Sequence, residues 1–126
     1  MQAFIDNIEA LTLENQNFRK VLYTWPNLQL VVMSLLPGEE IGEEIHDVED
    51  QFIRVEQGHA KAILEWVEHE LMDDMVVVIP AGMKHNIINL SATESLKLYT
   101  IYSPKHHPEN TIHVTKAEAD AAEHNE

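Results

Sequence analysis

The stretch DDMVVVIPAGMKHNIIN, residues 73–89, decides the fold that the sequence predicts. Its run MVVVI is short, apolar and β-branched, which is typical of a strand buried on both faces of a sheet. Pro80 and Gly82 follow as a rigid turn, and His85 comes directly after that turn. We therefore expect two strands joined by a tight turn, with a histidine held in a fixed position beside it.

The rest of the chain repeats this pattern of short strands and turns, which is typical of a sandwich or barrel. Trp25 and Pro26 begin a turn between two apolar runs, residues 18–24 and 28–36, and this arrangement predicts a hairpin. An acidic turn is expected at residues 70–74. Further strands are expected at residues 51–57, 59–67, 81–90 and 96–103.

Helix signals occur chiefly at the C-terminal end. Thr115 and Glu118 have the spacing of a capping box ahead of an alanine-rich run, which predicts a short helix. Residues 4–14 fit a helix and a strand equally. We therefore expect one all-β domain over residues 1–126, with its barrel core at about 18–103 and a tail at 104–126.

The composition excludes several classes of function. The formal net charge is −14, and such a surface repels nucleic-acid phosphates and anionic lipids. No segment resembles a signal peptide or is apolar enough to span a membrane, so we expect a cytoplasmic protein. The chain has no cysteine, so any metal must be held by nitrogen and oxygen atoms.

A second stretch, EEIHDVEDQFIRVEQG at residues 43–58, carries the other candidate ligands. Glu44 and His46 are two residues apart, so on a strand their side chains point to the same face. Gln51 begins the next expected strand and lies across from them. In a closed barrel the inward-facing side chains of neighbouring strands converge, which brings these three residues toward His85.

The spacings in these two stretches resemble the paired motifs of the cupin superfamily. The first runs from Gly38 through Glu44, His46 and Gln51 to Gly58, and the second from Asp74 through Pro80, Gly82 and His85 to Asn89. The resemblance covers roughly residues 28–103. It departs from the family pattern at Asp74, where glycine is usual, at Glu44, where histidine is usual, and at Gln51, where glutamate is usual.

The resemblance implies a small single-domain cupin, with a β-barrel of the jelly-roll type, that forms a homodimer. Pairing would also cover the edges of the apolar strands expected at residues 18–36. Glu44, His46, Gln51 and His85 are the expected ligands of one divalent transition metal. Such a nitrogen and oxygen donor set suits iron(II), manganese, nickel or zinc.

The remaining candidates have weaker support. A lone histidine near a turn is usually a surface residue, and only the second motif favours a ligand role for His46. His106, His107 and His113 belong to a tail that we expect to be exposed or to cover the barrel mouth, stiffened by prolines. The sequence identifies no catalytic residue, although Glu43 or a tyrosine would be able to transfer a proton.

Three functions fit these residues. The first is a metal-dependent enzyme of isomerase, lyase or dioxygenase type that acts on a small polar metabolite. The alternative is a barrel that binds a small ligand and catalyses nothing. The third is a metal-free structural barrel in which Glu44 and His46 only pair with each other. A fold of this kind does not decide among them.

Overall fold

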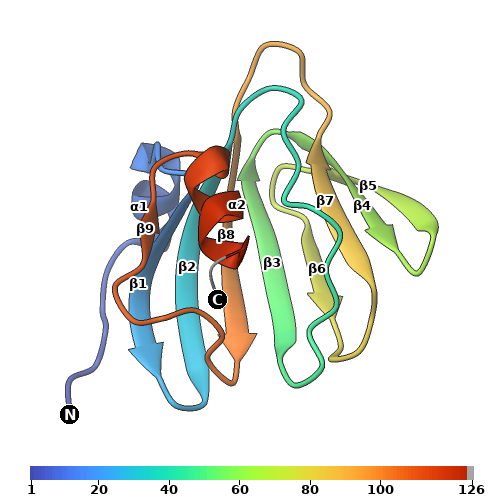
Figure 1. The fold of residues 1–126 in the computed structure, drawn as a ribbon. Coiled ribbons are helices and arrows are strands. Elements are labelled where there is room, and N and C mark those ends of the chain that lie inside the picture. The colour runs from blue at the N-terminus through green and yellow to red at the C-terminus, as the bar shows by residue number, and fades with distance from the viewer. Residues whose placement is uncertain (125–126) are drawn as a thin grey trace.

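The computed structural model describes residues 1–124, and most of them form two antiparallel β-sheets (Figure 1). The six-stranded sheet has the order β6-β3-β8-β2-β1-β9, and the three-stranded sheet has the order β5-β4-β7. The strands are β1 (Arg19–Trp25), β2 (Leu28–Leu35), β3 (Asp50–Gln57), β4 (His59–Leu64), β5 (Val67–Met72), β6 (Val76–Ile79), β7 (His85–Asn89), β8 (Leu96–Ser103) and β9 (Ile112–His113). This arrangement confirms the all-β fold and the hairpin at its N-terminal side.

The core lies between the sheets, where alternate residues of each strand point inward. Along β8 every second side chain is buried, from Leu96 to Tyr102. Strand β8 pairs with both β2 and β3, and Tyr102 lies directly opposite Gln29 on one side and Gln51 on the other. Because residues directly opposite each other share a face, these three side chains form one buried polar row at an end of the apolar core.

Two helices complete the described part of the chain, α1 (Ile8–Glu14) and α2 (Lys116–His124). Helix α1 settles the ambiguous N-terminal segment, and the Asn7 side chain caps it by accepting a 2.9 Å hydrogen bond from the amide of Ala10. Helix α2 is the short C-terminal helix that the sequence predicts. The hydroxyl oxygen of Thr115 accepts a 3.1 Å bond from the amide of Glu118, as in a capping box.

The structure corrects the prediction for β6. This strand forms an edge of the six-stranded sheet and is not buried on both faces, because Val76 and Val78 are 47% and 61% exposed. Only the side chains that alternate with these valines face the core, and Ile79 among them is 1% exposed. A short apolar run looks the same in sequence whether or not both of its faces are covered.

The strand expected over residues 59–67 ends instead at Leu64. The chain reverses at Glu65 and Trp66, which both have positive φ angles, of 47° and 73°, and a second strand, β5, begins at Val67. Such two-residue turns usually contain asparagine, aspartate or glycine, so the sequence gives no turn signal at this point. The acidic turn predicted at residues 70–74 is confined to its last two residues, which follow β5.

Neither helix within residues 1–124 is long and apolar enough to cross a membrane.

Candidate metal centre

The two sequence motifs meet where the irregular segment between β2 and β3 runs beside β7. Glu44 and His85 exchange two backbone hydrogen bonds of 2.9 Å and form an isolated β-bridge. The amide of Gly82 donates a 2.8 Å bond to the carbonyl oxygen of His46, which ties the Pro-x-Gly turn to the first motif. Glu44 and His46 are therefore held by β7 and its turn, and not by a regular strand as the sequence suggested.

Both histidines of the motifs point into the barrel. His46 is 6% exposed and His85 is 4% exposed, and the centres of their rings are 5.1 Å apart. The Nδ1 atom of His85 lies 2.9 Å from the carbonyl oxygen of Met83. Since a carbonyl only accepts, Nδ1 carries the proton and Nε2 presents a free lone pair to the interior.

Three buried atoms at this place have no hydrogen-bond partner among residues 1–124. They are Nε2 of His46, Nε2 of His85 and Oε1 of Gln51. The Nε2 atom of Gln51 donates a 3.0 Å bond to the hydroxyl of Thr100, which leaves the amide oxygen free to accept. A buried polar group left unsatisfied costs about 1–3 kcal/mol, so three such atoms on side chains that can ligate metals fit a cation site.

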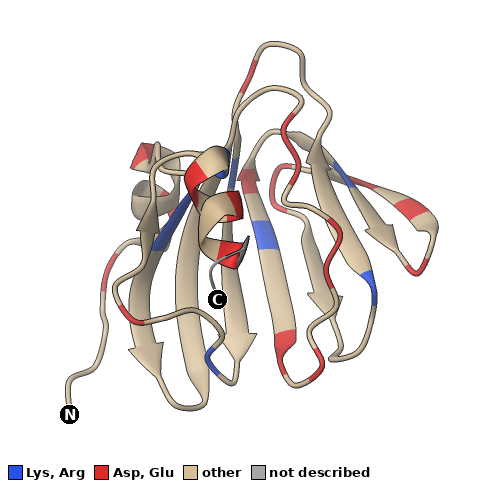
Figure 2. Cartoon of the chain, viewed as in Figure 1, with Lys and Arg blue, Asp and Glu red and all other residues tan. Residues whose placement is uncertain are grey.

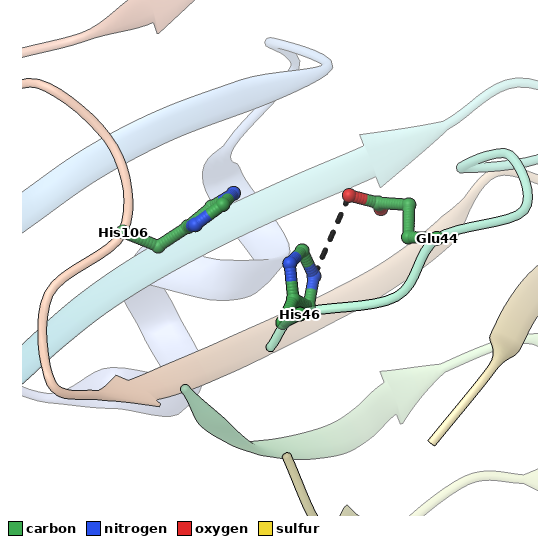
Figure 3. A group of neighbouring side chains, drawn as sticks. All are labelled: Glu44, His46 and His106. Atoms are coloured by element: carbon green, nitrogen blue, oxygen red, sulfur yellow. Dashed lines mark ion pairs between the residues drawn. The ribbon is translucent and has the colours of Figure 1, made fainter. Parts of the chain in front are cut away.

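The protonation states also fit a metal centre. Burial lowers the pKa of His46 to about 4 and lowers that of His85, so both rings are neutral near pH 7, the form that binds metals. Burial raises the pKa of Glu44 to about 7, and a cation beside the carboxyl group would favour its ionised form. Figure 3 shows Glu44 and His46 side by side, with Oε2 3.4 Å from Nε2. Because the His46 ring is uncharged near pH 7, its contact with Glu44 is not a salt bridge between two charged groups.

The structure adds His106 to this group, which the sequence interpretation placed in an exposed or covering tail. Its ring centre lies 4.4 Å from that of His46, and it stacks on Tyr102 at 5.1 Å. Within residues 1–124, Glu44, His46 and His106 each offer a ligand atom, and these atoms lie within 4.8 Å of one another (Figure 3). His85 lies outside this triplet, although its ring is next to that of His46.

A buried glutamine on β2 brings the tail into the site. The side-chain oxygen of Gln29 accepts bonds of 3.1 and 2.8 Å from the amides of His106 and His107, and its nitrogen donates to the carbonyl oxygen of His107 at 2.9 Å. Gln29 is fully buried. The only sequence signal for this contact is one polar residue inside the apolar run LQLVVM.

The structure also places the other candidates. Tyr102 is buried beside His46, whereas Tyr99 stacks on Phe52 at 6.2 Å on the opposite face of the sheet. The Glu43 side chain is 60% exposed and forms a 3.0 Å ion pair with Lys84. Tyr102 is therefore the tyrosine that faces the site.

A barrel of two antiparallel sheets with imidazole, carboxyl and amide groups at one end of its core defines the class of protein. A family model described as "Cupin domain" matches residues 31–102, which is more than half of the chain. The chain belongs to the cupin family, as the resemblance of its two motifs predicted.

Relatives of known sequence or structure agree with this assignment. The chain is 46% identical over 127 residues to the uncharacterized protein YrkC of Bacillus subtilis (strain 168), with 95% of this chain and 67% of that protein covered. The crystal structure of BH2720 from Bacillus halodurans is 43% identical, covers 95% of both chains and has a TM-score of 0.92. The structure of KdgF from Halomonas sp. is 26% identical, with 70% of this chain and 78% of that chain covered and a TM-score of 0.65.

Proposed function

We propose that the barrel binds one divalent transition metal through Glu44, His46, Gln51 and His85. The observation that carries this proposal is that three buried side-chain atoms able to bind a cation, on His46, His85 and Gln51, have no hydrogen-bond partner among residues 1–124. The nitrogen and oxygen donors suit iron(II), manganese, nickel or zinc. His106 lies close enough to His46 to act as a further donor.

We propose that the bound ion serves an enzyme of isomerase, lyase or dioxygenase type acting on a small polar molecule. Such a cation polarises an oxygen atom of a bound molecule or lowers the pKa of a water. Tyr102 is the chain's own candidate for a hydrogen-bond donor to the bound molecule, because its ring packs against His46 and His106. Burial raises the pKa of Tyr102, so its hydroxyl stays protonated and donates a hydrogen bond.

The second candidate function is a barrel that binds a small ligand without turnover. The burial of His46, His85 and Tyr102 favours it, because groups this inaccessible to solvent exchange substrate and product slowly. The two functions differ in one measurable property. An enzyme consumes its ligand on prolonged incubation, whereas a binding barrel returns it unchanged.

The metal site is tested by calorimetric titration of chelator-treated protein with each of the four ions. His46→Ala and His85→Ala are expected to weaken binding of the preferred ion by about 100-fold or more, because each removes a ligand. His106→Ala is expected to weaken it by about tenfold, within the range seen for residues that support ligands.

His59→Ala is the matched control for these variants. His59 is partly exposed on β4 and contacts Glu70 at 2.6 Å, outside the site, so its removal should leave the affinity unchanged. Equal affinity in wild type and in the His46 and His85 variants would contradict the proposed site.

A further inference from the structure

A buried arginine faces the same interior as the candidate ligands. Arg19 on β1 is 3% exposed and lies opposite Met33, a core residue of β2, so its side chain points inward. One Nη atom donates a 3.2 Å bond to Nδ1 of His113, and the guanidinium lies 5.4 Å from the ring centre of Phe18. Its buried Nε–H has no hydrogen-bond partner among residues 1–124.

The charge of Arg19 has no counter-ion in contact. Among the described residues Arg19 forms no ion pair, whereas the other arginine, Arg54, pairs with Glu56 at 3.2 Å and with Asp74 at 3.3 Å. A guanidinium keeps its charge under all ordinary conditions. Burying a charge without a partner costs several kcal/mol, and such groups are normally paired.

Arg19 faces the same barrel interior as the buried polar row, because Met33, its partner on β2, lies on the same face of that strand as Gln29. Tyr102, opposite Gln29 in that row, has its ring centre 5.7 Å from that of His46. The interior therefore holds a fixed cation as well as the candidate metal ligands.

We propose that Arg19 binds the carboxylate of the small molecule that the barrel holds. This inference rests on the proposed function, because the rest of that molecule would face the metal ligands. The planar guanidinium presents N–H donors in a fork that matches a carboxylate, and its unpaired Nε–H is one of them. Arg19 is a binding residue in this account and takes no part in proton transfer.

The surroundings favour a carboxylate over a phosphate. The net charge is −14, and Figure 2 shows acidic residues along the segment between β2 and β3 that borders the site. This field opposes a doubly charged anion more strongly than a singly charged one. A single arginine also balances one negative charge and not two.

The probe must be small, because Arg19, His46 and Tyr102 are all nearly inaccessible to solvent. We would titrate ¹⁵N-labelled protein with sodium acetate, with acetamide as the neutral analogue and with inorganic phosphate, and follow the Nε–H resonances of Arg19 and Arg54. Acetate is expected to shift the Arg19 resonance in a saturable way and to leave that of Arg54 unchanged. Acetamide and phosphate should bind at least tenfold more weakly than acetate, because loss of a charged hydrogen bond costs about that factor.

Variants test the same point by calorimetry. Arg19→Gln is expected to weaken acetate binding at least tenfold, Arg19→Lys to weaken it less, and Arg54→Gln to leave it unchanged. Because Arg19→Gln also removes the bond to His113, the melting temperature of each variant without ligand is measured first, to show that it is folded. Acetate binding that is the same in Arg19→Gln, preference for phosphate or acetamide, or no binding of any probe would overturn the inference.

The titrations are run on chelator-treated and metal-loaded wild type and on His85→Ala, so the two proposals fail in different ways. Acetate binding at Arg19 without metal binding would contradict the proposed metal centre and keep the carboxylate site. Metal binding without acetate binding would contradict the carboxylate site alone.

Discussion

At the scale of single residues, the site is defined by buried polar groups that destabilise the fold unless a ligand pairs with them. Buried atoms of His46, His85 and Gln51 and the Nε–H of Arg19 have no hydrogen-bond partner among residues 1–124. A buried polar group without a partner destabilises the fold, and natural proteins keep few of them. Their concentration at one end of the barrel indicates binding of ions more strongly than any one of the residues does alone.

Glu44 gives a pH dependence with a defined sign. Burial raises its pKa to about 7 in the folded protein from a model value of 4.5. Its contribution to stability is therefore fully present below the unfolded pKa and is lost as the pH rises through about 7. Glu44→Gln removes this loss, so the metal-free variant should be more stable than wild type above neutral pH by up to about 3 kcal/mol.

Thermal melts of both proteins in chelator, at intervals from about pH 4.5 to about pH 8, measure this difference. Asp74→Asn is the control, because Asp74 is an exposed acid at a turn. If the difference in melting temperature between wild type and Glu44→Gln stays constant over the whole pH range, burial does not raise the pKa of Glu44.

At the scale of elements, the tail after β8 is held against the barrel by Gln29. Gln29→Leu removes the acceptor for the amides of His106 and His107 and should destabilise the protein by about 1–3 kcal/mol. It should also raise hydrogen exchange at residues 104–110 and weaken metal binding as His106→Ala does. Gln57→Leu, at the exposed end of β3, is the control. Unchanged exchange in the tail would show that Gln29 does not hold it.

Sequence patterns gave the strands, the two motifs and the C-terminal helix, because these depend on local spacing and turn chemistry. Gly58 is one such position, with a φ angle of 132° and a side-chain direction blocked by Leu96 at 3.0 Å. The edge position of β6 and the turn at Glu65 and Trp66 depend on tertiary pairing, which local patterns do not contain. The roles of Arg19, Gln29 and His106 likewise arise only when distant segments meet.

At the scale of the whole molecule, metal binding should stabilise the fold. A free ion concentration of about 100 times the dissociation constant adds about 2.7 kcal/mol to the free energy of unfolding, if the ion binds only the folded protein. Loading the preferred ion should therefore raise the melting temperature of wild type, and chelator should reverse the change. His85→Ala should show neither effect. A melting temperature that ignores both ion and chelator would favour a metal-free structural barrel.

The homodimer remains a prediction, and the structure moves the edge at which we expect it. Strand β2 is paired on both sides and β1 is partly covered by β9, whereas β6 is an edge strand of the six-stranded sheet with Val76 and Val78 exposed. Sedimentation should show a dimer. Val78→Lys should weaken this dimer, whereas Val114→Lys, at an exposed position next to β9, should not. A wild-type monomer at all concentrations would contradict the prediction.

The measurement that tests the central claim most directly is the metal content of the purified protein. It is made by elemental analysis without an affinity tag or added metal, beside Glu44→Ala and His85→Ala. The account predicts close to one equivalent of a transition metal per wild-type chain and a large loss in both variants. No metal in the wild type, even after incubation with each ion, would contradict it.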